Sequence, residues 1–376
     1  MSVIFTVRNQ CLMTAVVQAN DKRLNDAKLY LQSLPMVKHS TATGEGGLVD
    51  LKRYDLVIVV ITMSRERTLA DEDRKRTFNL GYLTQTVARL LMILHTDDSA
   101  AFQRKKLVVC SVDPQPERFT EALEMSNYVE VVSLYQNTST NRQHVAGNMF
   151  EKEKDDYVYC LKTASRFESP YYLVVEDDVL LDKRAIETVH FVLSYFDLFS
   201  AVDWLFVKLY YPEKWLGYSR SCMTVAEVGG YSVLGGCLCA GVVLLIRRHR
   251  KFLLSCRTLP VWFWFTVGAV FIALLCVSIG RQYVESWRDY FVSTHQLVEA
   301  PGCCTQAVLY PAHIVSDLSS HLRRVHSDYD FSVDIAIDGF AHVRGLRRYL
   351  VQPNVAKHIG LISNLRRNSK SAQHFL

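Results

Sequence analysis

Two long uncharged stretches constrain the fold of this chain more than any other feature. One runs from Val228 to Ile246 and the other from Leu259 to Ile279, and neither contains a charged residue. Each has the ~20 residues that a helix needs to cross a bilayer. The alternative is a pair of buried core helices, but two such stretches so close together are unusual in a soluble core. The sequence therefore predicts a two-helix transmembrane hairpin within residues 222–282.

The connector between these stretches, residues 247–258, predicts the orientation of the hairpin. It contains five basic residues and no acidic one: Arg247, Arg248, Arg250, Lys251 and Arg257. By the positive-inside rule, such a loop lies in the cytoplasm. We therefore expect the globular parts on both sides of the hairpin to lie in the lumen or outside the cell.

Residues 1–19 predict neither a signal peptide nor a membrane anchor, because Arg8 and Asn9 interrupt the apolar runs. The hairpin is then expected to carry membrane insertion. The triplet Asn137-Thr138-Ser139 is a glycosylation sequon, which has meaning only in a lumenal loop. An oxidising lumen would also permit disulfides, whose pairing the sequence does not reveal, among six cysteines: Cys11, Cys110, Cys160, Cys222, Cys303 and Cys304.

The overall charge does not favour a nucleic-acid partner. The chain has 43 Lys plus Arg against 38 Asp plus Glu, and the surplus is not gathered into a long basic tract. A partner that carries phosphate is allowed but not required.

Outside the hairpin, strand-like apolar runs alternate with helical periodicity, which predicts an α/β domain with a mostly parallel sheet. The predicted strands are residues 54–61, 106–112, 128–134, 171–175, 204–210 and 302–311, and the predicted helices include 80–94, 157–167, 314–325 and 333–341. The segments after the hairpin are too few for an independent domain. We therefore expect one domain that the hairpin interrupts, with these parts: an N-terminal segment 1–50, a nucleotide-sugar-binding part 51–221, the hairpin 222–282 and a C-terminal part 283–376.

Three acidic residues, Glu176, Asp177 and Asp178, follow the apolar strand 171–175. Ligands of parallel α/β sheets bind beyond the carboxyl ends of the strands, where water or a ligand can satisfy such charges. Alternation along the chain directs Glu176 and Asp178 to one side and Asp177 to the other. Two carboxylates on one side suit Mg²⁺ or Mn²⁺, which could hold a diphosphate. One alternative to a metal site is that the three acids form a solvated turn. Another is a kinase-like or phosphatase site, although the chain lacks the GxxxxGK[ST] phosphate-binding loop.

Several longer motifs resemble, in the same order, the Golgi family of post-GPI-attachment N-acetylgalactosaminyltransferases. They are NMFEKEKDDYVYCL at 148–161, VVEDDV at 174–179, VKLYYPEKW at 207–215, CCTQAVLYP at 303–311 and VQPNVAKHIGLISNLR at 351–366. The resemblance extends over residues 56–368 and includes a hairpin that splits the catalytic domain. One departure is the N-terminal transmembrane helix of that family, which residues 1–19 do not predict.

The resemblance implies a GT-A fold and a metal-dependent inverting transfer of GalNAc. The donor would be UDP-GalNAc, the acceptor the first mannose of a GPI anchor already attached to protein, and the ion Mn²⁺ or Mg²⁺. It also implies a multi-pass Golgi membrane protein with a lumenal catalytic domain. Two other functions stay open: a Golgi GT-A transferase that uses UDP-GlcNAc on N-glycans, and a catalytically silent membrane scaffold.

Residue roles follow from the resemblance at matching positions. Asp178 is expected to contact the metal directly, while Glu176 and Asp177 organise the ribose, the metal waters and the loop. Arg65 would contact uridine or phosphate, with a solvated loop charge as the alternative. His358 would complete the metal site or bind phosphate, although a lone histidine is often structural.

An inverting transfer needs one general base near the acceptor hydroxyl and no covalent intermediate. The resemblance assigns this role to Asp334, near the start of the helix predicted at 333–341. The alternative is a carboxylate that only stabilises the N-terminus of that helix. Asp330 and Asp338 are competing candidates for the base.

Overall fold

The structure is a computed structural model of the chain. It describes residues 2–36, 53–65, 80–97, 102–135, 148–199, 203–212, 222–249, 259–280, 284, 295–328, 331–360, 362–363 and 368–369. The sequon at Asn137 and the competing base Asp330 lie outside the described residues. The chain divides into two compact units: Met1–Tyr210 together with Gln296–Leu376, and Tyr211–His295. The finer division at residues 50, 221 and 282 stays a prediction.

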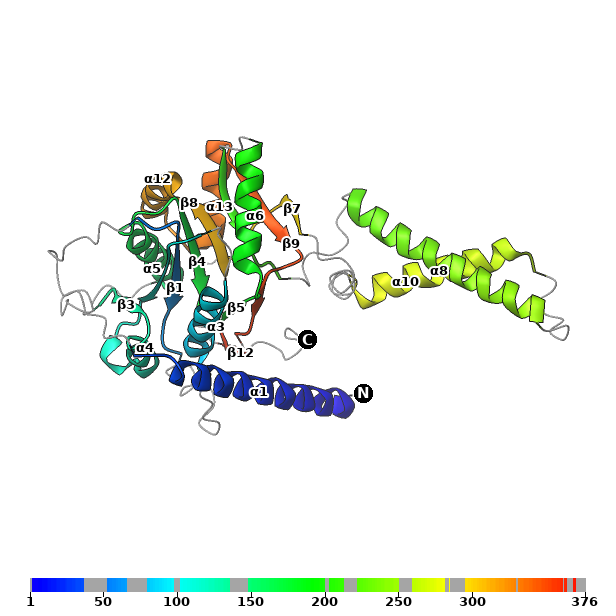
Figure 1. Cartoon of the computed structure of the whole chain (residues 1–376), viewed down its shortest axis with the longest axis horizontal. Helices are drawn as coiled ribbons and strands as arrows, with labels where there is room; N and C mark the ends of the chain where they lie inside the picture. Colours follow the sequence, from blue (N-terminus) through cyan, green and yellow to red (C-terminus); the bar gives the residue numbers. More distant parts are fainter. Residues whose placement is uncertain are drawn as a thin grey trace. The chain divides into compact units, whose positions relative to one another are not determined.

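The first unit is built on one eight-stranded sheet (Figure 1). In spatial order its strands are β3 (Glu130–Ser133), β2 (Lys105–Ser111), β1 (Leu56–Thr62), β4 (Tyr171–Glu176), β8 (Ala307–Pro311), β6 (Trp204–Lys208), β9 (Arg347–Gln352) and β7 (Gln296–Glu299). Only β8 and β7 pair antiparallel to their neighbours, so the other strands run in one direction. The predicted α/β fold with a mostly parallel sheet is therefore confirmed.

Helices cover both faces of this sheet (Figure 1). The described helices of this unit are α1 (Ser2–Gln32), α3 (Tyr82–Thr96), η1 (Pro116–Arg118), α4 (Thr120–Met125), α5 (Met149–Ala164), α6 (Ala185–Leu198), α12 (Ala312–Arg324) and α13 (Val333–Arg344). Alternation along β1 explains how both faces are buried: Leu56, Ile58 and Val60 pack into the core shared with α3 and α6. Val57 and Val59 are equally buried and point to the opposite face, where α5 packs.

The N-terminal helix α1 was not predicted from the sequence. Its second half buries Leu24 and Leu31, and it packs against α3. Asn20 and Arg23 also reach α3 through hydrogen bonds to the side chain of Gln85. The second half of α1 is therefore part of the globular unit.

A second, two-stranded sheet lies beside the end of β4. It pairs β5 (Val179–Leu181) antiparallel with β10 (Ala356–His358), so residues far apart in sequence meet there. A third small sheet pairs β11 (Ile362–Ser363) with β12 (Asn368–Ser369). The disulfide Cys110–Cys160 ties β2 to α5, with a Cα–Cα distance of 5.8 Å.

The second unit contains the two apolar helices α8 (Cys222–His249) and α10 (Val261–Ile279). Both are long and apolar enough to cross a membrane, over Val225–Arg248 and Val261–Ile279, and only 11% of an apolar 18-residue stretch within each helix is buried. They pack on each other through small residues, because Gly235 and Gly268 approach closely. These exposed apolar surfaces are not those of buried core helices, so the structure favours the predicted hairpin.

Candidate active site

The three acidic residues leave the sheet at the carboxyl end of β4. Glu176 is the last residue of the strand, and Asp177 and Asp178 turn toward β5. The backbone N–H of Glu176 donates to Gln306 O at 2.8 Å, and that of Asp177 donates to Ile61 O at 3.1 Å. The turn is thus tied to both neighbouring strands, and its carboxylates lie at the predicted edge of the sheet.

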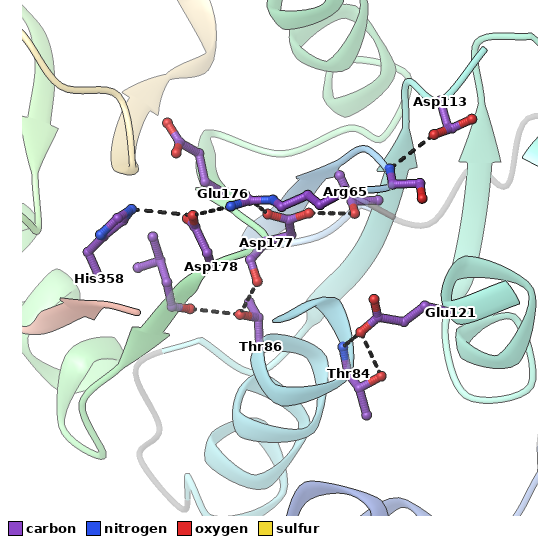
Figure 2. A network of polar contacts seen from close by, with 12 residues as sticks. Arg65, Thr84, Thr86, Asp113, Glu121, Glu176, Asp177, Asp178 and His358 are labelled. Carbon is purple, nitrogen blue, oxygen red and sulfur yellow. Dashed lines mark hydrogen bonds and ion pairs between the residues drawn. The ribbon is translucent and has the colours of Figure 1, made fainter. Parts of the chain in front are cut away.

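The β5–β10 pairing places His358 beside this turn. β5 begins at Val179, directly after Asp178, and His358 lies opposite Val179 in the register. The N–H of Ile359 donates to the carbonyl oxygen of Asp178 at 2.8 Å. As a result, His358 Nε2 lies 3.3 Å from Asp178 Oδ2 (Figure 2). The imidazole ring stacks on Tyr210 with a centroid distance of 6.0 Å.

Arg65 bridges two of the acids (Figure 2). Its Nη2 lies 2.6 Å from Asp177 Oδ1 and its Nη1 lies 2.9 Å from Asp178 Oδ2. The guanidinium group also lies over the ring of Tyr82, with 4.9 Å from Cζ to the centroid. Burial by itself would lower the pKa of Arg65, but Asp177 and Asp178 outweigh burial and raise it. Arg65 therefore stays charged between the two carboxylates.

Other residues hold Arg65 and Asp177 in place. Asp113, beyond the end of β2, accepts a hydrogen bond from the backbone N–H of Ser64 at 3.0 Å. Thr62 Oγ1 donates to Asp177 Oδ2 at 2.8 Å, and Thr86 Oγ1 donates to the carbonyl of Asp177 at 2.6 Å. Burial raises the pKa of Asp177, whereas Arg65 opposes that rise. These contacts fix the position of Asp177 in the turn, while its predicted role in organising the loop stays a prediction.

Helix α3, which carries Thr86, is itself anchored by a partly buried acid. Glu121 accepts hydrogen bonds from the N–H and the hydroxyl of Thr84, at 2.7 and 2.8 Å (Figure 2). Burial raises the pKa of Glu121 to about 7. The start of α3 is therefore fixed relative to the acidic turn.

Three residues near the turn could hold a metal ion. Glu176, Asp178 and His358 each offer one ligand atom, and these atoms lie within 4.8 Å of one another. Gly360 leaves room at this point, because a Cβ there would overlap Asp178 Oδ2 and lie 3.0 Å from His358 Nε2. Two carboxylates and an imidazole suit Mn²⁺, so the residues fit the predicted ion.

Asp334 is connected to this cluster by hydrogen bonds from the loop before β8. It lies in the first turn of α13, and its Oδ2 accepts a hydrogen bond from Cys304 N at 2.8 Å. The next residue, Thr305, donates from Oγ1 to Glu176 Oε1 at 3.2 Å. Burial raises the pKa of Tyr157, and both Glu176 and Asp334 add to that rise. The predicted base therefore lies near the acidic turn, on the side of Glu176.

The competing base Asp338 lies one helical turn after Asp334 and has a cationic partner. Its Oδ1 lies 3.1 Å from Arg348 Nη1. This ion pair engages the Asp338 carboxylate with a residue of β9. The contacts therefore favour Asp334 over Asp338, while the role of base stays a prediction.

Two ionisable residues near Asp334, the buried Lys208 and the partly buried Glu153, were missed by sequence analysis. Lys208 donates to Pro301 O at 3.1 Å and also to Cys303 O, and burial lowers its pKa to about 8. Burial, followed by the charge of Asp334, raises the pKa of Glu153 to about 7. A signal for Glu153 was available, because it precedes the buried Tyr157 by four residues and shares its helix face.

The structure thus brings together five of the six predicted site residues directly, and Asp334 through one loop. The predicted roles of these residues stay predictions.

Comparison with known proteins gives one match over most of the chain. The family model described as GPI-N-acetylgalactosamine transferase PGAP4 matches residues 56–357. Among solved structures, a similar chain is the mannosyltransferase PcManGT from Pyrobaculum calidifontis in complex with GDP-Man and Mn²⁺, at 15% identity and a TM-score of 0.22. That match covers 53% of this chain and 45% of the other, so the chain spans less than half of the structure it matches.

Proposed function

Because the chain belongs to the GPI-N-acetylgalactosamine transferase PGAP4 family, which is a family of glycosyltransferases, we propose that it moves GalNAc from UDP-GalNAc to the core mannose of protein-attached GPI anchors. Its mostly parallel sheet, whose strands lie on both sides of the apolar helix pair in the sequence, is compatible with the GT-A-like fold predicted from the sequence. The reaction is metal-dependent and inverts the configuration of the transferred sugar.

The observation that carries this proposal is the cluster of Glu176, Asp178 and His358 at the carboxyl edge of the sheet. These three residues would hold Mn²⁺ or Mg²⁺. When bound, the ion supplies positive charge to the diphosphate as UDP departs. Arg65 stays protonated beside them and adds a fixed cation for the uridine diphosphate, while Asp177 keeps the loop in position.

Asp334 is the proposed general base. One of its carboxylate oxygens accepts the hydrogen bond from Cys304 N, which orients the carboxylate. It takes the proton of the mannose hydroxyl as that oxygen attacks the anomeric carbon, and the bond to UDP breaks on the opposite face. No covalent intermediate forms, so one base is sufficient.

The hairpin is proposed to hold the catalytic unit near its acceptor, in the Golgi membrane and on the lumenal side. A GPI anchor is attached to lipid, so its core glycan lies close to the bilayer. The exposed apolar faces of α8 and α10 support membrane insertion. A tether in the middle of the catalytic unit raises the effective concentration of the acceptor.

The proposal is tested with purified full-length protein in detergent, with UDP-GalNAc and a GPI-anchored protein. Mass spectrometry should show one added GalNAc on the GPI glycan, with UDP released, and EDTA should abolish transfer until Mn²⁺ is restored. Asp178→Asn should lower kcat by about 100-fold or more, because it removes a charged metal ligand. The matched control is Asp182→Asn, which changes an exposed acid just after β5.

Two results would contradict the proposal. Preferential use of UDP-GlcNAc on N-glycans would indicate the other transferase. No transfer, together with an unchanged GPI glycan in cells that carry Asp178→Asn, would indicate a scaffold. The same assay in vesicles tests the tether: a variant with a soluble linker in place of 222–282 should lose its advantage for lipid-anchored acceptors, and undiminished transfer would exclude this role.

A further inference from the structure

The loop between β7 and β8 contains a disulfide between adjacent residues, Cys303 and Cys304. Sequence analysis placed a strand over residues 302–311, but the strand begins only at Ala307. Both cysteines have a positive φ, 81° and 77°, which residues other than glycine rarely adopt. Two such residues in succession persist only where something constrains them, and the covalent ring between their side chains is that constraint.

This loop contacts the site at consecutive positions. Cys303 O accepts a hydrogen bond from the buried ammonium of Lys208. Cys304 N donates to Asp334 Oδ2 at 2.8 Å, and Thr305 Oγ1 donates to Glu176 Oε1 at 3.2 Å.

Gly302 also lies against α13, because a Cβ at this position would be 2.6 Å from Asp338 Oδ2. The loop therefore fits closely between α13 and the acidic turn.

We propose that the Cys303–Cys304 disulfide is a positioning element of the active site, which fixes the distance between the base Asp334 and the metal ligand Glu176. The inference rests on the proposed function for the roles of these two carboxylates. Without the disulfide, two ordinary side chains would relax toward negative φ, because positive φ is unfavourable for them. The N–H of residue 304 would then turn away from Asp334, and the hydroxyl of Thr305 would turn away from Glu176.

The test compares two double variants of the full-length protein in detergent. Cys303→Ser with Cys304→Ser removes the ring and leaves residues that disfavour positive φ, so kcat should fall by about 10-fold or more. Cys303→Gly with Cys304→Gly also removes the ring, but glycine adopts positive φ readily, so kcat should stay within about threefold of wild type. At saturating Mn²⁺ the KM for UDP-GalNAc should change little in either variant, because Arg65 is positioned by its ion pairs with Asp177 and Asp178.

A control separates positioning from general stability. Cys110→Ser with Cys160→Ser removes the disulfide between β2 and α5, which should lower Tm and leave kcat at low temperature unchanged. The Ser–Ser variant at 303 and 304 should show the opposite pattern: a small change in Tm and a large loss of kcat. The proposal is overturned if the Ser–Ser variant keeps the wild-type kcat, or if the Gly–Gly variant falls as far as the Ser–Ser variant.

Two measurements do not depend on the sugar donor. Alkylation of the unreduced, denatured protein followed by peptide mass mapping should recover residues 303 and 304 unmodified and two mass units lighter than the dithiol. Mn²⁺ affinity, measured calorimetrically, should fall in the Ser–Ser variant and recover in the Gly–Gly variant, because the loop holds Glu176. If wild-type protein transfers no GalNAc, the proposed function fails, whereas free thiols at 303 and 304 or unchanged Mn²⁺ affinity would overturn the positioning role.

Discussion

Gly360 provides a strict test of the proposed metal site. It follows His358 and Ile359 at the end of β10, and an added Cβ would overlap Asp178 Oδ2 and lie 3.0 Å from His358 Nε2. Its φ lies outside the left-handed region, so alanine can adopt this backbone conformation without strain. Gly360→Ala therefore adds one methyl group directly against two of the three proposed metal ligands.

The size of the expected loss of Mn²⁺ affinity follows from how firmly Asp178 is held in place. Only 3% of this residue is exposed, its carbonyl accepts from Ile359 N, and its Oδ2 faces Arg65 at 2.9 Å. To relieve the overlap, the carboxylate must move by about 1 Å, and a displacement of that size can reduce catalysis by roughly 100-fold. Disturbed support of a metal ligand commonly weakens metal binding by about 10- to 100-fold. We expect a loss of Mn²⁺ affinity in that range, with kcat reduced at limiting Mn²⁺.

The assay is a calorimetric Mn²⁺ titration of the detergent-solubilised protein, accompanied by UDP release over the same range of Mn²⁺. The matched control is Gly339→Ala in α13, where an added Cβ has no atom within 4 Å and the helix gains propensity. It should bind Mn²⁺ like wild type. Wild-type Mn²⁺ affinity in Gly360→Ala, with an unchanged Tm, would refute the assignment of Asp178 and His358 to a common metal site.

Two further predictions concern buried charges. Burial, followed by the charge of Asp334, raises the pKa of Glu153 from 4.5 to about 7, so the folded state favours the protonated form and stability is lost as pH rises between those values. Glu153→Gln should therefore unfold with the wild-type free energy at pH 4.5 and with a free energy higher by at most about 3 kcal/mol at pH 8, seen as a higher Tm. A Tm equal to that of wild type at both pH values would contradict the argument. Arg65→Lys keeps the charge but cannot donate to Asp177 and Asp178 through a planar fork, so unfolding should become easier by about 1–3 kcal/mol. Arg104→Lys, at a side chain that is 57% exposed, should leave Tm unchanged, and an equal effect of both substitutions would exclude a special role for Arg65.

Much of the fold is predictable where one element provides a strong local pattern. The β-branched run 56–62 and the apolar run before Glu176 appear as adjacent strands, and the acids emerge at the expected edge. The start of α5 was misplaced, because the helix begins at Met149 rather than near Tyr157. Asn148 caps it by accepting a hydrogen bond from Phe150 N, and this local signal was overlooked.

The remaining parts of the site depend on contacts that no local pattern shows. His358 reaches Asp178 only because two three-residue strands pair across a long sequence separation. Strands of three residues are too short to show an alternating pattern of apolar and polar residues. Lys208 also looks like an ordinary strand residue, and its burial becomes apparent only when the 301–305 loop folds over it.

The position of β8 in the sheet has a consequence for biosynthesis. β8 follows the apolar helix pair in the chain, yet it lies between β4 and β6, which both precede that pair. The central hydrogen-bond ladder therefore cannot close until the ribosome has made both apolar helices. In the proposed membrane topology the chain must also return to the side from which it left, so an even number of crossings is required. A molecule in which only one helix inserted would leave β7, β8 and β9 on the opposite side of the bilayer from β4 and β6. The unpaired edges of β4 and β6 would then distinguish a misinserted chain from a native one for the cell's folding surveillance.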